Sequence, residues 1–264
     1  VERLREVKAY ADKHDLDIHM HVAQSDRETR QVMERYGKRP VELLEELGYL
    51  TPRLHAAHIT ETSEEEQRLL ARRGVSMALC TGSIGIINGE LPPAEAYLSY
   101  GGRVGLGTDQ APGNNLFNEM KFTAILHKYK HNDPTVFPAW KVLRMATIEA
   151  AESMGIAEQV GSLRPGKKAD VILMDLHSPA MSPVLSGPVR NIVPNIVYSA
   201  SGSEVETVII DGRVVVENYV LQTMDEVQEI AAANKAAERI CQRLRDTGWE
   251  RELPLAQWTK EGLY

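Results

Sequence analysis

The 264-residue sequence predicts an α/β fold, followed by a small β-rich region and a C-terminal helix. Three observations predict it. Short apolar strands alternate with amphipathic helices up to Gly155, which is the pattern of parallel βαβ units. After Gly155 the pattern changes to β-rich segments joined by a strong hairpin turn. A charged, amphipathic helical segment follows them.

Four strands are predicted in the α/β part, each short and apolar enough to be covered on both faces of a sheet. They are residues 16–23, 54–59, 75–79 and 103–107. Helices follow from apolar residues at helical spacing, from Pro40 at a helix start and from Glu66 at the capping-box position after Ser63. They are residues 1–14, 27–36, 40–47, 63–73, 93–100, 115–130 and 138–154.

The later part of the sequence predicts a small antiparallel β region. Its strands are residues 169–174, 205–210 and 213–217, with Asp211-Gly212 as the hairpin turn. Residues 224–246 read as a docking or surface helix. A closed TIM barrel needs eight βα units and a doubly wound sheet can use four or five strands. The four βα units predicted here therefore leave both architectures open.

Composition excludes several classes of partner. The net charge of −7 and the lack of a long Lys/Arg run disfavour nucleic acid, and the basic stretch 164–168 reads as a solvated turn. No apolar run has membrane length, and no signal peptide opens the sequence, so no membrane partner is expected. Cys80 and Cys241 imply no disulfide framework and suggest a cytoplasmic location. Residues 1–8 resemble the middle of a helix, so we expect the sequence to begin partway through a domain.

Polar side chains stand at the ends of three predicted strands. His19 and His21 are two residues apart on a strand and so share a face, His58 ends the next strand, and Asp109 follows a glycine-rich strand. Alone, each histidine could be a hydrogen-bonded core residue and Asp109 a helix N-cap. Together, imidazole nitrogens and a carboxylate suit zinc or a similar divalent ion, which activates water for hydrolysis.

Six segments carry a resemblance to a known family. HMHVAQ, LHAAHITETSEEE, GLGTDQAPGNN, ATIEAAESMGI, GSLRPGKKADVILMD and VIIDGRVVVEN occur in this order. Together they resemble the second half of an amidohydrolase of the chlorohydrolase and S-adenosylhomocysteine/methylthioadenosine deaminase branch. The resemblance implies strands 5 to 8 of a TIM (β/α)8 metal-dependent hydrolase barrel in residues 1–160. It also implies part of a composite β-sandwich in residues 161–221, with a C-terminal helix and tail in 222–264.

The resemblance also implies roles for individual residues. His21 resembles the strand-5 metal ligand, and Asp109 the strand-8 aspartate that touches the metal and acts as general base. His58 resembles the strand-6 histidine, which contacts water or substrate in mononuclear members and ligates metal in binuclear ones. Gln24 stands where deaminases of this branch usually carry Glu; it keeps the hydrogen-bonding place but cannot supply an acidic proton. His19 is expected to pack or to support a tautomer.

These matches imply a hydrolase with one divalent metal, Zn or alternatively Fe or Mn. It would break a C–N or C–Cl bond of a small nitrogen heterocycle and would form a homo-oligomer. The family's strand-1 His-X-His pair is absent, and this motivates the alternative of a non-catalytic or truncated amidohydrolase-like binding protein. A flavodoxin-like binding domain is a third hypothesis, disfavoured by the late β-rich part.

Two segments between strands are candidate substrate-lining loops or simple turns. They are Cys80-Thr-Gly-Ser-Ile-Gly and Gly113-Asn-Asn115. Cys80 is not expected to be a nucleophile, because no base is paired with it in the sequence and a small buried role is more common.

Overall fold

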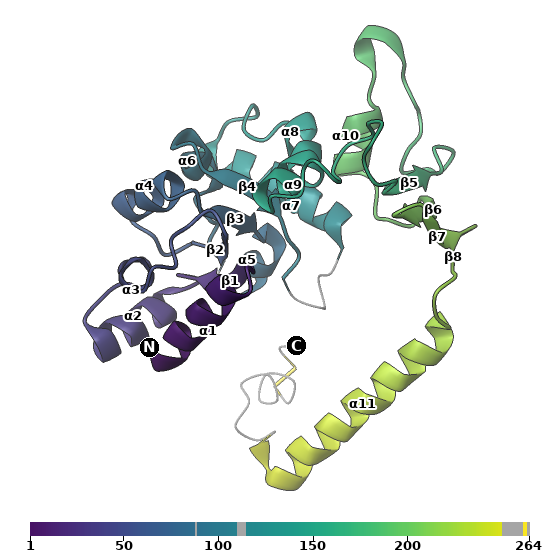
Figure 1. The fold of residues 1–264 in the computed structure, drawn as a ribbon. Coiled ribbons are helices and arrows are strands. Elements are labelled where there is room, and N and C mark those ends of the chain that lie inside the picture. The colour runs from purple at the N-terminus through teal and green to yellow at the C-terminus, as the bar shows by residue number, and fades with distance from the viewer. Residues whose placement is uncertain (88, 110–114, 250–260, 263–264) are drawn as a thin grey trace.

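The computed structural model describes residues 1–87, 89–109, 115–249 and 261–262 (Figure 1). Within these residues, four strands form a parallel sheet in the order β1-β2-β3-β4, and four later strands form a sheet in the order β5-β6-β7-β8. The second sheet is antiparallel throughout. The predicted α/β class and the change to a β-rich part are therefore both present.

The parallel sheet and its helices account for the first 153 residues of the chain. The strands are β1 (Ile18–Val22), β2 (Leu54–His58), β3 (Ser76–Leu79) and β4 (Arg103–Leu106). The helices are α1 (Glu2–Lys13), α2 (Asp26–Tyr36), α3 (Pro40–Glu46), α4 (Glu64–Arg72), α5 (Thr81–Ile87), α6 (Ala94–Ser99), α7 (Leu116–His131), α8 (Ala139–Met145) and α9 (Ile148–Ser153).

The later elements form the antiparallel sheet and the C-terminal helix. They are β5 (Val171–Met174), a 3-10 turn (Gly187–Val189), α10 (Ile192–Tyr198), β6 (Val205–Ile210), β7 (Arg213–Glu217), β8 (Val220–Leu221) and α11 (Glu226–Thr247). None of the 22 described residues of α11 is buried, and the helix stands apart from the parallel sheet (Figure 1). In the part of the chain that the structure describes, no helix is both long and apolar enough to cross a bilayer.

The two faces of the parallel sheet differ in chemistry. One face carries bulky apolar side chains that pack under the helices in the main core; among them are Val22, Leu54, Ala56, Met77, Leu79 and Val104. The other face carries two rows of residues in register across the four strands. The first row is His19, His55, Ser76 and Arg103, and the second is His21, Ala57, Ala78 and Gly105. Side chains alternate along a strand, so these polar and small residues share the face away from the core.

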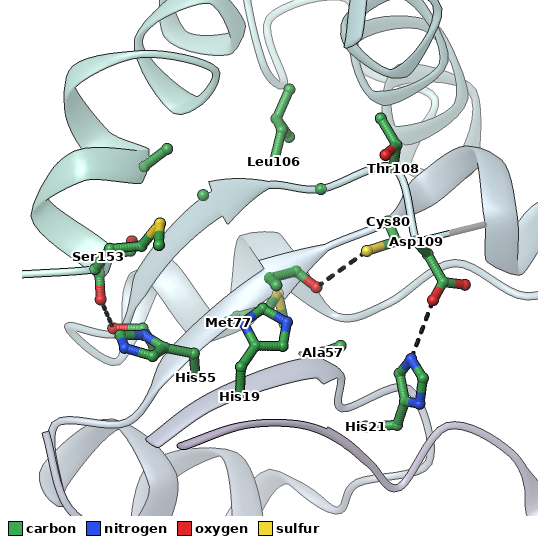
Figure 2. Close-up of a pocket in the computed structure, with 16 residues that line it drawn as sticks. His19, His21, His55, Ala57, Met77, Cys80, Leu106, Thr108, Asp109 and Ser153 are labelled. Atoms are coloured by element: carbon green, nitrogen blue, oxygen red, sulfur yellow. Dashed lines mark hydrogen bonds and ion pairs between the residues drawn. The ribbon is translucent and has the colours of Figure 1, made fainter. Parts of the chain in front are cut away.

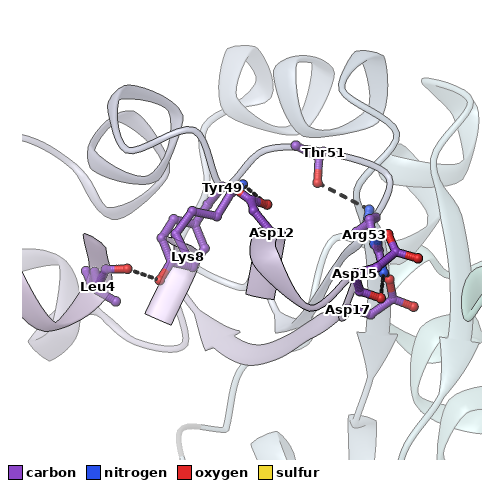
Figure 3. Close-up of polar contacts among 8 residues, drawn as sticks. All are labelled: Leu4, Lys8, Asp12, Asp15, Asp17, Tyr49, Thr51 and Arg53. Carbon is purple, nitrogen blue, oxygen red and sulfur yellow. Dashed lines mark hydrogen bonds and ion pairs between the residues drawn. The ribbon is translucent and has the colours of Figure 1, made fainter. Parts of the chain in front are cut away.

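Polar contacts fix α1 and the start of β1 against the start of β2 (Figure 3). The Tyr49 hydroxyl donates a hydrogen bond to the main-chain oxygen of Leu4 at 2.6 Å. Arg53 binds Asp17 at 2.7 Å and also contacts Asp15, both of which lie between α1 and β1. These contacts help to hold the edge strand in register with the rest of the sheet.

Three sequence predictions needed correction. Cys80 to Gly85 is not a loop, because Thr81 begins α5. The helix predicted over 138–154 is two helices, α8 and α9, since Thr147 has φ −132° and ψ −100°. Helix α10 was not predicted. Glycines disfavour helix in the α5 segment, and its first turn is held by hydrogen bonds from Gly82 to a distant side chain. Of the other predicted loop, residues 113 and 114 lie outside the described residues, and Asn115 is the N-cap of α7.

Candidate metal centre

Three side chains converge at the carboxyl edge of the parallel sheet. His21 lies near the end of β1, His58 is the last residue of β2, and Asp109 follows β4. His21 Nε2 is 3.0 Å from Asp109 Oδ1, and His58 Nε2 is 3.9 Å from the same oxygen. The two imidazole rings stack with their centroids 5.0 Å apart. The candidate ligand atoms, one from each residue, all lie within 4.8 Å of one another, so the three residues could hold a metal ion together.

The backbone at this edge adopts a conformation that is uncommon for residues other than glycine. His58 has φ 74° and Asp109 has φ 63°, both in the left-handed region. Such residues store strain, and they concentrate at sites where side chains must point in a required direction. The convergence of the three side chains therefore depends on backbone geometry as well as on strand order.

His58 is the most buried member of the group. Its exposed fraction is 0%, and neither ring nitrogen has a hydrogen-bond partner among the described residues. Burial lowers the pKa of His58 to about 4, so the imidazole is neutral near pH 7. A buried nitrogen without a partner is unfavourable, and a neutral imidazole is a good ligand for a divalent ion. These features, with the carboxylate of Asp109 beside them, fit a bound metal.

Asp109 is held ionised by its neighbours. Burial alone would raise its pKa, but hydrogen bonds from Ser83 and His21 outweigh that effect, and the pKa is lowered. Ser83 donates to Oδ2, whereas His21 contacts Oδ1. The two oxygens therefore have different partners.

A cavity of about 410 Å³ opens beside this group (Figure 2). His19, His55 and Cys80 line it together with His21 and Asp109, and small residues of the strands form much of the remaining wall. His21 and Asp109 point toward one another at one end of it (Figure 2). This volume suits a small molecule, and the small side chains leave room for one beside the convergent polar groups.

Other predicted residues lie around this group rather than in it. Gln24 lines a neighbouring hollow together with Glu61 and Glu90, and its backbone N–H donates to Glu28 at 2.7 Å. His19 lies on the cavity wall, where burial lowers the pKa of its imidazole. Burial raises the pKa of the Cys80 thiol to about 12, so Cys80 is protonated at neutral pH, which argues against a nucleophilic role.

The sequence assigns no individual role to two residues that shape the site. Ser83 lies in the segment that is predicted to be a substrate-lining loop or a turn, and Glu119 lies on α7. Glu119 is buried, with 3% of its surface exposed. A lone glutamate in a helical segment gives no sign in the sequence that it will be buried, so only the structure identifies it.

Several known proteins resemble this chain. It is 37% identical over 240 residues to 5-methylthioadenosine/S-adenosylhomocysteine deaminase of Desulforudis audaxviator, covering 90% of this chain and 55% of that protein. It is 39% identical over 240 residues to 5'-deoxyadenosine deaminase of Methanothermobacter thermautotrophicus, covering 89% of this chain and 55% of that protein. The chain thus spans about half the length of the curated relatives it matches.

Solved structures with a similar fold include two that contain zinc. An adenosine deaminase from Xanthomonas campestris with bound zinc superposes with a TM-score of 0.83 at 31% identity, covering 90% of this chain and 54% of that one. A variant of the atrazine chlorohydrolase of Arthrobacter aurescens TC1, complexed with zinc and atraton, gives a TM-score of 0.77 at 26% identity, covering 89% and 51%. The sequence profile of the amidohydrolase family matches residues 1–215, and the chain therefore belongs to that family.

Proposed function

We propose that this chain carries the catalytic C-terminal half of a metal-dependent hydrolase that breaks a C–N or C–Cl bond of a nitrogen heterocycle. The observation that carries the proposal is the convergence of His21, His58 and Asp109 at the carboxyl edge of a parallel sheet. Active sites of barrel enzymes lie at this edge. The names of the relatives, which are deaminases and a chlorohydrolase, support this class of reaction.

The proposed architecture is a barrel to which this chain contributes strands 5 to 8. Two observations support it: β1 and β4 are the edges of the parallel sheet in the described residues, and the match covers only 55% of the relative from Desulforudis audaxviator. Residues 1–160 would form the partial barrel, 161–221 part of a β-sandwich, and 222–264 the terminal helix and tail. Polypeptide beyond these 264 residues would supply strands 1 to 4, including a further pair of histidines for the metal.

The residues of the convergent group have distinct proposed roles. His21 and Asp109 would hold one divalent ion, and zinc is supported by its presence in two similar structures. Fe and Mn are the alternatives. A bound ion of this kind lowers the pKa of a coordinated water molecule towards 7. The ionised Asp109 would also accept the proton of the attacking water. His58 would position water or substrate, or ligate a second ion.

Deamination is the first reaction to test. The deaminases share 37% and 39% identity with this chain, whereas the chlorohydrolase shares 26%. Gln24 would offer a hydrogen bond to the heterocycle without an acidic proton, so loss of an amine or a halide is the second possibility to test. The free thiols of Cys80 and Cys241 support the reducing cytoplasm as the proposed compartment, and family resemblance supports a homo-oligomer.

The test combines metal analysis with turnover. Metal content of the purified chain, measured by plasma mass spectrometry, should show bound zinc that is lost in His21→Ala. The full-length polypeptide should release ammonia from 5'-deoxyadenosine or 5'-methylthioadenosine, or chloride from atrazine, and Asp109→Asn should abolish release. Bound zinc without turnover of any of these compounds would favour the binding-protein alternative. A lack of zinc in the 264-residue chain alone would mean that its ligands are insufficient without the further pair of histidines, whereas a lack of zinc in the full-length polypeptide would refute the metal site.

A further inference from the structure

The orientation of Asp109 is set by a serine on a helix that the sequence did not predict. Ser83 lies in the first turn of α5 and is 3% exposed. Its hydroxyl donates to Oδ2 of Asp109, while Oδ1 faces His21 at 3.0 Å and His58 at 3.9 Å. One carboxylate oxygen is therefore engaged by Ser83, and the other is directed at the two imidazoles.

Ser83 is itself held in place from α7. The carboxylate of Glu119 accepts hydrogen bonds from the Gly82 N–H at 3.2 and 3.0 Å. A Cβ atom at Gly82 would lie 2.8 Å from Glu119 Oε2, so the absence of a side chain at Gly82 permits this approach. The Thr81 hydroxyl makes a second link to α7, a hydrogen bond of 3.0 Å to Thr123. The first turn of α5 is thus fixed by two buried polar contacts.

We propose that Ser83 is a positioning residue that fixes Oδ2 of Asp109 and thereby presents Oδ1 to the ion that Asp109 would hold with His21. This inference rests on the proposed metal-dependent function. A carboxylate can rotate about its terminal bond, and groups that hydrogen-bond to a metal ligand fix its orientation and raise metal affinity. Without Ser83, Asp109 would keep its charge and its place in the chain, but its carboxylate would be free to rotate, and neither oxygen would be held toward the imidazoles.

The test measures zinc affinity of the full-length polypeptide by competition with a chromogenic chelator. We expect Ser83→Ala to weaken zinc binding about 10- to 100-fold, the range typical for residues that orient a metal ligand. Ser83→Thr keeps the hydroxyl and should restore most of the affinity. Ser99→Ala is the matched control, because that hydroxyl also donates a hydrogen bond, to the main-chain oxygen of Ala96 at 2.7 Å, but lies on α6 away from the site.

Thermal unfolding of the metal-free variants separates positioning from folding. Ser83→Ala should unfold within several degrees of the wild type, because a single hydrogen bond contributes only a small part of the stability of a folded chain. Equal zinc affinity of Ser83→Ala and wild type would overturn the positioning role and leave the metal site standing. Weaker binding that Ser83→Thr does not rescue, with a matching loss of thermal stability, would also overturn it. A wild-type full-length polypeptide that binds no zinc would overturn the proposed metal site and this inference together.

Discussion

The buried carboxyl group of Glu119 makes the stability of the chain depend on pH in an unusual direction. Glu119 is 3% exposed and lies on α7, where its carboxylate accepts the hydrogen bonds from Gly82. Burial raises its pKa from 4.5 to about 7; hydrogen bonds from the α5 turn oppose the rise, and the negative charge of Asp109 adds to it. The neutral acid is therefore the form that the fold prefers.

The sign of the effect follows from linkage. In the unfolded chain Glu119 ionises near pH 4.5, whereas in the folded chain it stays protonated until pH rises to about 7. The folded state then binds more protons than the unfolded state, so stability falls as pH increases through this window. The contribution is fully present below pH 4.5 and lost above about pH 7. Its size is roughly 3 kcal/mol, since one pKa unit corresponds to about 1.4 kcal/mol.

Urea unfolding of the wild type and of Glu119→Gln from about pH 4.5 to about pH 8 measures this contribution. Gln keeps an acceptor for Gly82 and does not titrate, so the difference in unfolding free energy between the two proteins isolates Glu119. As pH rises over this range, the unfolding free energy of the wild type should fall by roughly 3 kcal/mol relative to that of Glu119→Gln. A difference that stays constant over the whole range would refute the reasoning.

Glu204 provides a matched control of opposite sign. It is also buried, with 4% exposed, and accepts backbone hydrogen bonds from Ser201 at 3.0 Å and Gly202 at 3.1 Å. Burial would raise its pKa, but these N–H donors outweigh burial and lower it. The contribution of Glu204 to the stability of the fold is present at neutral pH and is lost as pH falls. In Glu204→Gln the pH-dependent difference from the wild type should therefore change in the opposite direction.

Three further predictions concern packing, a hydrogen bond and thiol reactivity. Gly105→Ala would place a Cβ atom 2.8 Å from the backbone of α9, so urea unfolding should show an unfolding free energy lower by roughly 1–3 kcal/mol. A Cβ atom at Gly85 would meet nothing within 4 Å, so Gly85→Ala should cause no such loss. Equal losses in the two variants would contradict this prediction. Tyr49→Phe removes the hydrogen bond to α1 and should lower the unfolding free energy by about 1 kcal/mol in the same measurement. An unchanged unfolding midpoint would show that this hydrogen bond does not contribute to stability. At pH 8 a thiol reagent should modify Cys241, which is exposed, and spare buried Cys80 until urea is added; rapid reaction of both native thiols would be inconsistent with the pKa of about 12 for Cys80.

The strands of the parallel sheet could be predicted from the sequence because their apolar runs are local signals. Residues 54–59 and 103–107 were predicted, and β2 and β4 occupy Leu54–His58 and Arg103–Leu106. Helix α5 could not be predicted in the same way. It contains Gly82 and Gly85, and its first turn is fixed by Glu119, a residue 37 positions away in the sequence. A contact between residues so far apart in the sequence produces no periodic pattern from which the helix could be predicted.

The candidate site shows the same division between local and distant information. The sequence placed His21, His58 and Asp109 at strand ends, and the parallel register brings those ends together. Gln24 was predicted beside them from family resemblance alone. It follows Ala23, which has φ 48°, and it lines the hollow next to the convergent group. Its predicted role toward the substrate stays a prediction.

A left-handed backbone conformation also explains how His58 reaches the convergent group. In register, His21 pairs with Ala57 and Val22 pairs with His58, so strand alternation alone would direct His58 to the face opposite His21. The rings nevertheless stack with centroids 5.0 Å apart, and His58 has φ 74°. The left-handed conformation at the last residue of β2 therefore redirects the imidazole across the sheet edge toward Asp109. An ion bound by His58 would compensate for that strained backbone and would give a partner to one of the two buried ring nitrogens that have none among the described residues.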